Sequence, residues 1–291
     1  MLIYILSRGA RLYSTSRIYR AALKKRHNVR ILDHMECDLL IDGNQYKVIY
    51  NNETLLKPDL IIPRIGSSAT AYGTTVVRHF QEMGVPVLNR VEGILNSRDK
   101  FRCLQLLSAA NIPIPVTYFS NDLHHAEKLV ERKLGYPFII KLLEGTQGTG
   151  VHLIHDEREA HEIFNKYGVA RKKILLQEYI AEFSGKDVRA FVVGNRVVAT
   201  MMRIAAGDDF RSNIHRGGRG EKIILSEEEK EMAIRAVHTL GLKVAGVDIL
   251  RSKKGAMVIE VNSSPGLEGI ESTTGVEIAE EIIKYIEVDA T

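Results

Sequence analysis

The chain has 291 residues, enough for two or three subdomains that share a sizeable core. Its 45% hydrophobic and 26% charged residues are ordinary for a globular enzyme, and a net charge of +4 is too small to demand a nucleic-acid partner, although it suits anionic ligands such as nucleotides. The two cysteines, Cys37 and Cys103, have no CxxC spacing, which argues against a disulfide framework or a zinc site. No apolar stretch reaches the ~20 residues that a membrane span needs, so we expect a cytoplasmic protein without a membrane partner.

The first ~90 residues alternate strand and helix, which predicts a small doubly wound α/β unit. Apolar runs predict buried strands, and amphipathic stretches predict helices. The strands are expected at residues 2–6, 29–32, 60–63 and 85–88, and the helices at 16–26 and 72–83. Residues 39–56 predict a hairpin with Asp42-Gly43 and Asn51-Asn52 as turn signals. A further helix is expected at residues 97–110, with Ser97 as its N-cap.

Beyond residue 115 the pattern is typical of an α+β unit. Strands are expected at residues 138–143, 151–154 and 174–180, in a hairpin at 188–193 and 196–202, and in a second hairpin at 244–250 and 256–261. Helices are expected at 157–167, 227–240 and 277–286. Ser226 and Glu229 have the spacing of a capping box at the start of the second of these helices.

Lys141 lies in an apolar strand and is followed by a glycine-rich segment, residues 145–150 (GTQGTG). A lysine among apolar residues is costly unless its ammonium group meets an anion. Closely spaced glycines let backbone N–H groups approach phosphate oxygens. The segment is not a Walker loop or a dinucleotide fingerprint, because a strand follows it and no Gly-Lys-Ser/Thr occurs. It predicts a phosphate-binding loop, with a plain hairpin turn beside a snorkelling lysine as the alternative.

Three polar residues of the last predicted hairpin suggest a metal site. Glu260 and Asn262 are two residues apart on one strand, so their side chains point to one face. Asp248, on the preceding strand, shares that face only if the turn at residues 252–255 gives the matching register. Carboxylate and amide oxygens together suit magnesium rather than zinc. In the alternative, one acid simply faces solvent.

Two further segments carry groups that suit a nucleotide. The strand at residues 174–180 includes Glu178 and Tyr179, which could present backbone groups to an adenine edge, and Asp187 follows near the start of the next strand. The loop at residues 209–219 (DFRSNIHRGGR) concentrates arginines, which suits carboxylate or phosphate recognition. The alternative is a solvated basic loop. Its RGGRG segment also looks like an RNA-binding motif, although one copy without aromatic residues is poor support.

These motifs resemble the RimK branch of the ATP-grasp ligases. The matching segments are residues 5–8 (ILSR), 63–66 (PRIG), 98–100 (RDK), 144–151 (EGTQGTGV), 209–218 (DFRSNIHRGG), 246–251 (GVDILR) and 260–270 (EVNSSPGLEGI). The resemblance covers nearly the whole chain, and its C-terminal motif is long and specific. It implies an ATP-grasp fold of α/β and α+β parts: a pre-ATP-grasp α/β domain at 1–95, a lobe with the phosphate loop at 96–185, and a lobe with the magnesium site at 186–291.

The resemblance also implies the residues of the site and its ligands. The nucleotide would be ATP, and the metal would be two magnesium ions, or manganese in their place. The nucleotide-binding residues would be Lys100, Lys141, Gly145, Gly148, Gly150, Glu178, Tyr179, Asp187, Arg211, Ser212 and Asn213. The metal ligands would be Asp248, Glu260 and Asn262. Lys141 and Arg211 would be catalytic, because they offset charge that develops on the transferred phosphoryl group.

The best-known member of this branch adds glutamate to the C-terminus of the sixth small-subunit ribosomal protein. We therefore expect an ATP-dependent ligase that joins L-glutamate to the C-terminal carboxylate of a ribosomal protein through an acyl phosphate. Relatives that ligate amino acids to cofactors or to amino-group carrier proteins leave another acceptor open. An RNA- or ribosome-associated binding module is the non-enzymatic alternative. The expected partners are ATP, L-glutamate and an acceptor protein C-terminus or cofactor carboxylate, and a homo-oligomer, dimer or tetramer, remains possible.

Overall fold

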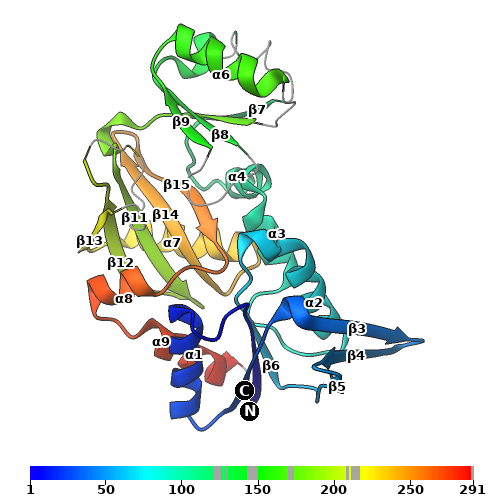
Figure 1. Cartoon of the computed structure of the whole chain (residues 1–291). Helices are drawn as coiled ribbons and strands as arrows, with labels where there is room; N and C mark the ends of the chain where they lie inside the picture. The colour runs from blue at the N-terminus through cyan, green and yellow to red at the C-terminus, as the bar shows by residue number, and fades with distance from the viewer. Residues whose placement is uncertain are drawn as a thin grey trace.

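The structure is a computed structural model that describes residues 1–120, 126, 128, 130–142, 150–169, 174–207, 210 and 217–289. The described residues form four sheets, whose arrangement Figure 1 shows. The predicted combination of α/β and α+β parts is confirmed. None of the described helices is long and apolar enough to cross a membrane.

The N-terminal sheet has the parallel order β2-β1-β6. Its strands are β1 (Leu2–Leu6), β2 (Asn28–Leu32) and β6 (Leu60–Pro63), and α1 (Tyr13–Lys24) and α2 (Thr70–Glu82) follow β1 and β6. The predicted strand at 85–88 contributes only an isolated bridge between Ile61 and Val87. Strand β1 reads as a continuous apolar run because both faces of this sheet are covered: Ile3 and Ile5 pack in one core cluster, and Tyr4 and Leu6 in another.

The segment predicted as one hairpin, residues 39–56, forms three antiparallel strands instead. These are β3 (Cys37–Asp42), β4 (Gln45–Tyr50) and β5 (Glu53–Thr54), in the order β3-β4-β5. Both turn signals lie at turns, since Gly43, Asn51 and Asn52 all have positive φ. The second turn signal reverses the chain into a short third strand, which the hairpin prediction missed.

The helix predicted at residues 97–110 is wrong at its start, because two helices meet there: α3 (Val91–Arg98) and α4 (Lys100–Ala109). Ser97 lies inside α3, where its hydroxyl donates to the Ile94 carbonyl. The N-cap of α4 is Asp99, whose side chain accepts from the backbone N–H groups of Phe101 and Arg102. A carboxylate at this position satisfies two orphan donors and complements the helix dipole.

The lobe sheet is antiparallel, with the order β7-β10-β8-β9. Its strands are β7 (Thr117–Ser120), β8 (Phe138–Leu142), β9 (Val151–Ile154) and β10 (Ile174–Glu178). Helix α6 (Glu157–Val169) covers one face, where Phe138 and Ile140 pack against Phe164. A π-helical turn lies at Val130–Leu134, and 3₁₀ turns lie at His34–Glu36, Ser67–Ala69 and Ala181–Phe183.

The C-terminal sheet has the antiparallel order β13-β12-β11-β14-β15. Its strands are β11 (Lys186–Val193), β12 (Arg196–Ile204), β13 (Arg219–Lys222), β14 (Val244–Ser252) and β15 (Gly255–Asn262). One face is covered by α7 (Glu227–Thr239), which begins at the predicted capping box of Ser226 and Glu229. Helices α8 (Glu268–Thr274) and α9 (Ile278–Asp289) cover part of the other face. In Figure 1 the lobe sheet stands above this sheet, and β1 and α1 lie below it.

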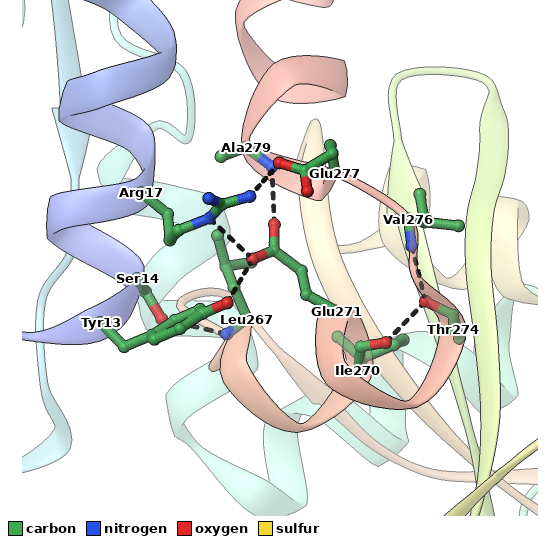
Figure 2. Close-up of polar contacts among 10 residues, drawn as sticks. All are labelled: Tyr13, Ser14, Arg17, Leu267, Ile270, Glu271, Thr274, Val276, Glu277 and Ala279. Atoms are coloured by element: carbon green, nitrogen blue, oxygen red, sulfur yellow. Dashed lines mark hydrogen bonds and ion pairs between the residues drawn. The ribbon is translucent and has the colours of Figure 1, made fainter.

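The N-terminal unit and the C-terminal helices are joined by buried polar contacts, shown in Figure 2. The carboxylate of Glu271, which is 6% exposed, accepts from Tyr13 Oη (3.0 Å), Arg17 Nε (3.1 Å) and the Ala279 backbone N–H (3.1 Å). Ser14 Oγ accepts from the Leu267 backbone N–H at 3.0 Å. Strands β1 and β6 also share a core cluster with β11, α8 and α9. These contacts fix the end of the N-terminal sheet against the segment that follows β15.

Candidate active site

The strand pair β14–β15 places Asp248 directly opposite Glu260 and Gly246 directly opposite Asn262. Directly opposed residues of antiparallel strands point to the same face, so the three polar side chains share one face. The turn alone does not produce this register. From the pair Ser252–Gly255 the ladder runs regularly to the pair Ile249–Val258, which would next oppose Asp248 to Ile259. A β-bulge at this point leaves Ile259 unpaired and brings Glu260 opposite Asp248.

Asp248, which is 2% exposed, lies at the centre of an ionic network in the C-terminal sheet. Arg189, its cross-strand neighbour on β11, donates to both carboxylate oxygens at 2.7 Å. Arg203 Nη2 lies 2.8 Å from Asp248 Oδ2, and Arg203 also forms a two-pronged contact of 2.5 Å with Asp187. The Asn262 amide is 3.4 Å from Asp248 Oδ2. Alternation along β11 puts this network on the face opposite to α7.

The charges of this network are balanced within the sheet. Burial opposes ionisation of Asp248, but Arg189 and Arg203 outweigh it and hold the pKa of that carboxyl below its usual range. Burial likewise opposes the charge of Arg203, and the carboxylates of Asp248 and Asp187 raise the pKa of its guanidinium instead. The carboxylate of Asp248 and the guanidinium of Arg203 therefore each favour the charged form of the other.

Lys141 on β8 faces this network from the lobe sheet. Its Nζ donates to Gln177 Oε1 at 2.7 Å, and Gln177 Nε2 donates to Thr117 Oγ1 at 2.9 Å. Burial lowers the pKa of Lys141; the charges of Glu260 and Asp248 oppose this shift, whereas Lys100 adds to it. The ammonium group of Lys141 is thus hydrogen-bonded to a neutral amide. The charges that act on it come from the C-terminal sheet and from α4.

The other predicted nucleotide residues within the described part of the chain lie on or directly beside α4, β9, β10 and β11. Lys100 is half-buried in the first turn of α4. Glu178, at the end of β10, accepts from the Val116 backbone N–H (3.2 Å) and from Lys254 Nζ (3.0 Å), and Tyr179 follows it half-buried. Asp187 is 5% exposed and paired with Arg203 rather than open to a ligand.

Gly150 has a φ of +87°, and its carbonyl accepts from the Leu142 backbone N–H at 2.8 Å. A Cβ built on this glycine would lie 2.8 Å from Leu142 Cδ1, so both its backbone conformation and the space beside it require glycine. The predicted site residues Gly145, Gly148, Arg211, Ser212 and Asn213 lie outside the described residues.

The donor set of Asp248, Glu260 and Asn262 fits a hard cation such as magnesium. The groups comprise two carboxylates and an amide on one face, and Glu260 is exposed, with no hydrogen-bond or ion-pair partner among the described residues. No group of three or more His, Cys, Asp or Glu side chains suited to a metal occurs in the part of the chain that the structure describes. The third protein ligand would therefore have to be the amide oxygen of Asn262.

Arg189, Arg203 and Gln177 position the predicted residues but were not themselves predicted from the sequence. A charged residue in an otherwise apolar strand is the signal that could have revealed the arginines, because Arg189 is two residues from Asp187 and shares its face. The pairing of Asp187 with Arg203 depends on a second bulge. The hairpin is regular from Val193–Arg196 to Val192–Val197, and then Val198 is skipped.

Comparison with known proteins matches both halves of the chain. Residues 1–94 match the family model described as RimK PreATP-grasp domain, and residues 97–286 match the one described as RimK-like ATP-grasp domain. A protein of Picosynechococcus sp. named probable alpha-L-glutamate ligase is 49% identical over 290 residues, which cover 100% of this chain and 96% of that protein. A protein of the same name from Nitrosococcus oceani is 47% identical over 291 residues, with coverage of 100% and 97%.

Solved structures also align over the whole chain. The ATP-grasp ligase PsnB, complexed with minimal precursor, Mg and ADP, superimposes with a TM-score of 0.77 at 18% identity, and the alignment covers 99% of this chain and 98% of that one. At this level of identity the similarity concerns the fold.

Proposed function

Because the chain belongs to the RimK-like ATP-grasp family and is an ATP-dependent carboxylate–amine ligase, we propose that it joins L-glutamate to the C-terminal carboxylate of a ribosomal protein. The donor follows from the names of its close relatives, which are probable alpha-L-glutamate ligases. The acceptor is proposed from the family resemblance alone, because the best-known member of this branch modifies a ribosomal protein. Ligation of an amino acid to a cofactor or to an amino-group carrier protein is the second candidate.

One observation carries the chemical part of the proposal. Asp248 and Glu260 oppose each other on one face of the C-terminal sheet, and Lys141 faces them from the lobe sheet, near enough for both acids to raise its pKa against the effect of burial. Oxygen ligands on one side and a buried cation on the other are the groups that a magnesium–triphosphate complex needs. The structure of PsnB, which shares the fold, is of a complex with minimal precursor, Mg and ADP.

The proposed reaction has two steps. The acceptor carboxylate attacks the γ-phosphorus of ATP, which forms an acyl phosphate and releases ADP. The amine of glutamate then attacks the acyl carbon, expels inorganic phosphate and loses a proton, which leaves an amide. An acyl phosphate is needed because the oxygen of a free carboxylate is a poor leaving group.

Each side chain of the site has a role that its position supports. Asp248, Glu260 and Asn262 would hold magnesium, whose charge would offset that of the nucleotide phosphates. Lys141 would exchange its contact with Gln177 for a phosphate oxygen, and Lys100 would bind the phosphates beside it. Arg189 and Arg203 act indirectly, because they keep Asp248 ionised and fix its position. Glu178 and Tyr179 are proposed at the adenine edge, and Arg211 at the transferred phosphoryl group.

The test combines phosphate release with mass spectrometry of the product. The protein is incubated with ATP, magnesium and each of the twenty amino acids, first with the C-terminal peptide of a small-subunit ribosomal protein and then with carrier-protein or cofactor acceptors. We expect phosphate release to require both substrates and the peptide to gain the mass of glutamate residues. Preference for lysine or alanine over glutamate would disprove the donor, and ligation only to a cofactor or carrier would disprove the acceptor. RNA binding without ATP turnover would favour the binding module.

We also propose the domain boundaries, the cellular location, and the metal and oligomeric state of the protein. The division into parts at 1–95, 96–185 and 186–291 is supported by the separate sheets in each range. A cytoplasmic location is supported by Cys37 and Cys103, which are both unpaired thiols. Manganese in place of magnesium, two ions per site and a dimer or tetramer are expectations from the family resemblance alone.

A further inference from the structure

Two arginines at the junction of the N-terminal and C-terminal units have no role in the reaction described so far. Arg64 directly follows β6, and Arg98 is the last residue of α3. Both belong to short segments that carry the family resemblance, residues 63–66 and 98–100, and neither arginine has been assigned a function. Ligands of open α/β sheets bind at the carboxyl ends of the strands, which is where Arg64 lies.

Within the part of the chain that the structure describes, each arginine is bonded to a backbone carbonyl and to no acid. Arg64 Nη2 donates to the Pro265 carbonyl at 2.7 Å, and Arg98 Nη2 donates to the Ile65 carbonyl at 2.5 Å. Among the described residues no carboxylate lies within ion-pair distance of either guanidinium. Burial and the neighbouring charge of Arg98 lower the pKa of Arg64 to about 10, and burial lowers the pKa of Arg98 although Glu260 opposes this. Two half-buried like charges close together repel each other, and a bound anion would relieve this repulsion.

Unused hydrogen-bond donors accompany the arginines. Within the described residues, the buried Nε of Arg98 has no acceptor, and the buried hydroxyls of Ser263 and Ser264 have no partner. Ser263 is only 4% exposed. Buried donors are nearly always satisfied in native proteins, so three of them in one region indicate a missing acceptor.

Along the chain, Ser263 and Ser264 lie between Asn262 of the candidate metal site and Pro265, whose carbonyl accepts from Arg64. Ser263 directly follows Asn262, and the next residue but one, Pro265, is the residue that Arg64 binds. The buried side chain of Asn89 holds this segment in place, since its amide nitrogen donates to the carbonyls of Ser263 (3.1 Å) and Val244 (2.7 Å). Asn89 of the N-terminal unit thus fixes the segment at Ser263, the residue that follows Asn262 in the chain.

We propose that Arg64 and Arg98, together with the hydroxyls of Ser263 and Ser264, bind a carboxylate of a ligation substrate beside the metal site. A carboxylate is flat, carries one negative charge and accepts up to four hydrogen bonds, which matches a group of donors with two guanidinium forks. The site would hold that substrate next to the phosphates while the amide forms. This inference rests on the proposed function, in which both substrates carry a carboxylate.

The experiment measures the KM of each substrate for Arg64→Gln, Arg98→Gln and Ser263→Ala. Arg78→Gln is the matched control, because Arg78 is an exposed arginine of the same N-terminal unit and pairs with Glu92. We expect each arginine variant to raise the KM of one carboxylate substrate about 10- to 100-fold, and Ser263→Ala to raise it less. The KM of ATP in these variants, and every KM of the control variant, should stay within about twofold of the wild-type value. Arg98→Lys, which keeps the charge but loses the planar fork, should fall between Arg98→Gln and the wild type.

The substrate whose KM rises identifies the source of the carboxylate, either the amino-acid donor or the acceptor. A rise for ATP alone would overturn the proposal in favour of a phosphate site, and unchanged KM values in folded variants would overturn it altogether. If an arginine variant does not fold, Ser263→Ala decides, because its hydroxyl has no partner to lose. Failure of the wild type to ligate glutamate would instead disprove the proposed function and is seen before any variant is compared.

Discussion

The two sides of the candidate site differ in how their charges are balanced. In the C-terminal sheet, the carboxylates of Asp187 and Asp248 are paired with Arg203 and Arg189 at 2.5 to 2.7 Å. Opposite them, the ammonium group of Lys141 is hydrogen-bonded to the neutral amide of Gln177. Each of these two carboxylates thus has an arginine partner, whereas the ammonium group of Lys141 has no anionic hydrogen-bond partner among the described residues.

This difference separates residues whose loss should cost stability, such as Arg203, from residues whose loss should cost ligand binding, such as Lys141. Removing one member of a balanced buried pair leaves an uncompensated charge, so the cost falls on folding. Removing an unbalanced cation relieves a desolvation penalty, so the cost falls on binding. The four predictions below test this separation.

The largest effect is expected for Arg203→Leu, which leaves Asp187 without its arginine and Asp248 with only one. We expect the free energy of unfolding in urea to fall by about 3–5 kcal/mol. Arg196→Leu is the control, because the exposed Arg196 pairs with Glu281 at 3.0 Å on the surface and should cost less than about 1 kcal/mol. Equal effects of the two substitutions would contradict the structural role of the network.

Glu260→Gln should abolish most turnover without affecting the fold. Glu260 is exposed and has no partner in the described structure, so the free energy of unfolding should change by less than about 0.5 kcal/mol. Its kcat should fall by about 10²–10³-fold, since a charged group that supports the transition state is lost. Asn262→Asp should retain part of the activity because it keeps a hard oxygen at the same reach. Steady-state kinetics with magnesium titration measures both, and normal turnover of Glu260→Gln would refute the metal assignment.

Lys141→Met should weaken nucleotide binding and leave stability unchanged or slightly higher. The methionine fills a similar volume without a buried charge, so the melting temperature should not fall. The Kd of ATP measured by calorimetry should rise about 10- to 100-fold, the range of a charge-assisted hydrogen bond. Lys284→Met, an exposed lysine paired with Glu281, is the control. An unchanged ATP affinity would show that Lys141 is structural.

The smallest effect is expected for Glu229→Gln, at a balanced pair remote from the site. Glu229 receives hydrogen bonds from Arg251 and from the Ser226 backbone, and these lower its pKa although burial opposes them. A lowered pKa means that the stabilisation is present above the unfolded-state value of about 4.3 and is lost as the pH falls through the folded-state value. The variant should lose about 1 kcal/mol at pH 7 and less at pH 3, with kcat unchanged. Urea titrations at both pH values check the sign.

Local sequence predicted the features that depend on neighbours in the chain. The capping box of Ser226 and Glu229 lies where its spacing placed it, and the continuous apolar run of residues 2–6 is a buried parallel strand. The family resemblance drawn from the motifs is confirmed, and with it the ATP-grasp fold and the ligase class. These predictions were correct because helix caps, strand periodicity and motifs depend on residues that are close together in the sequence.

The assembly of the candidate metal site was decided by packing across strands. Val258 and Val261 are three residues apart, so in a regular strand they would point to opposite faces, yet both are buried in the core under α7. The bulge at Ile259 allows both to be buried, and it also turns Glu260 away from that core, opposite Asp248. The turn at 252–255 by itself would place Ile259 opposite Asp248. The sequence alone could therefore say only that Asp248 joins Glu260 if the register of the two strands matches.

The sequence by itself determined which residues could carry the chemistry, because a carboxylate, an amide or a lysine in an apolar strand is recognisable from its neighbours. Only the tertiary structure decided which of them meet. Two bulges, at Val198 and Ile259, set the pairing of Asp187 with Arg203 and of Asp248 with Glu260. The free energy that selects a bulge comes from burying apolar side chains against distant helices, and that information is not contained in the strand itself.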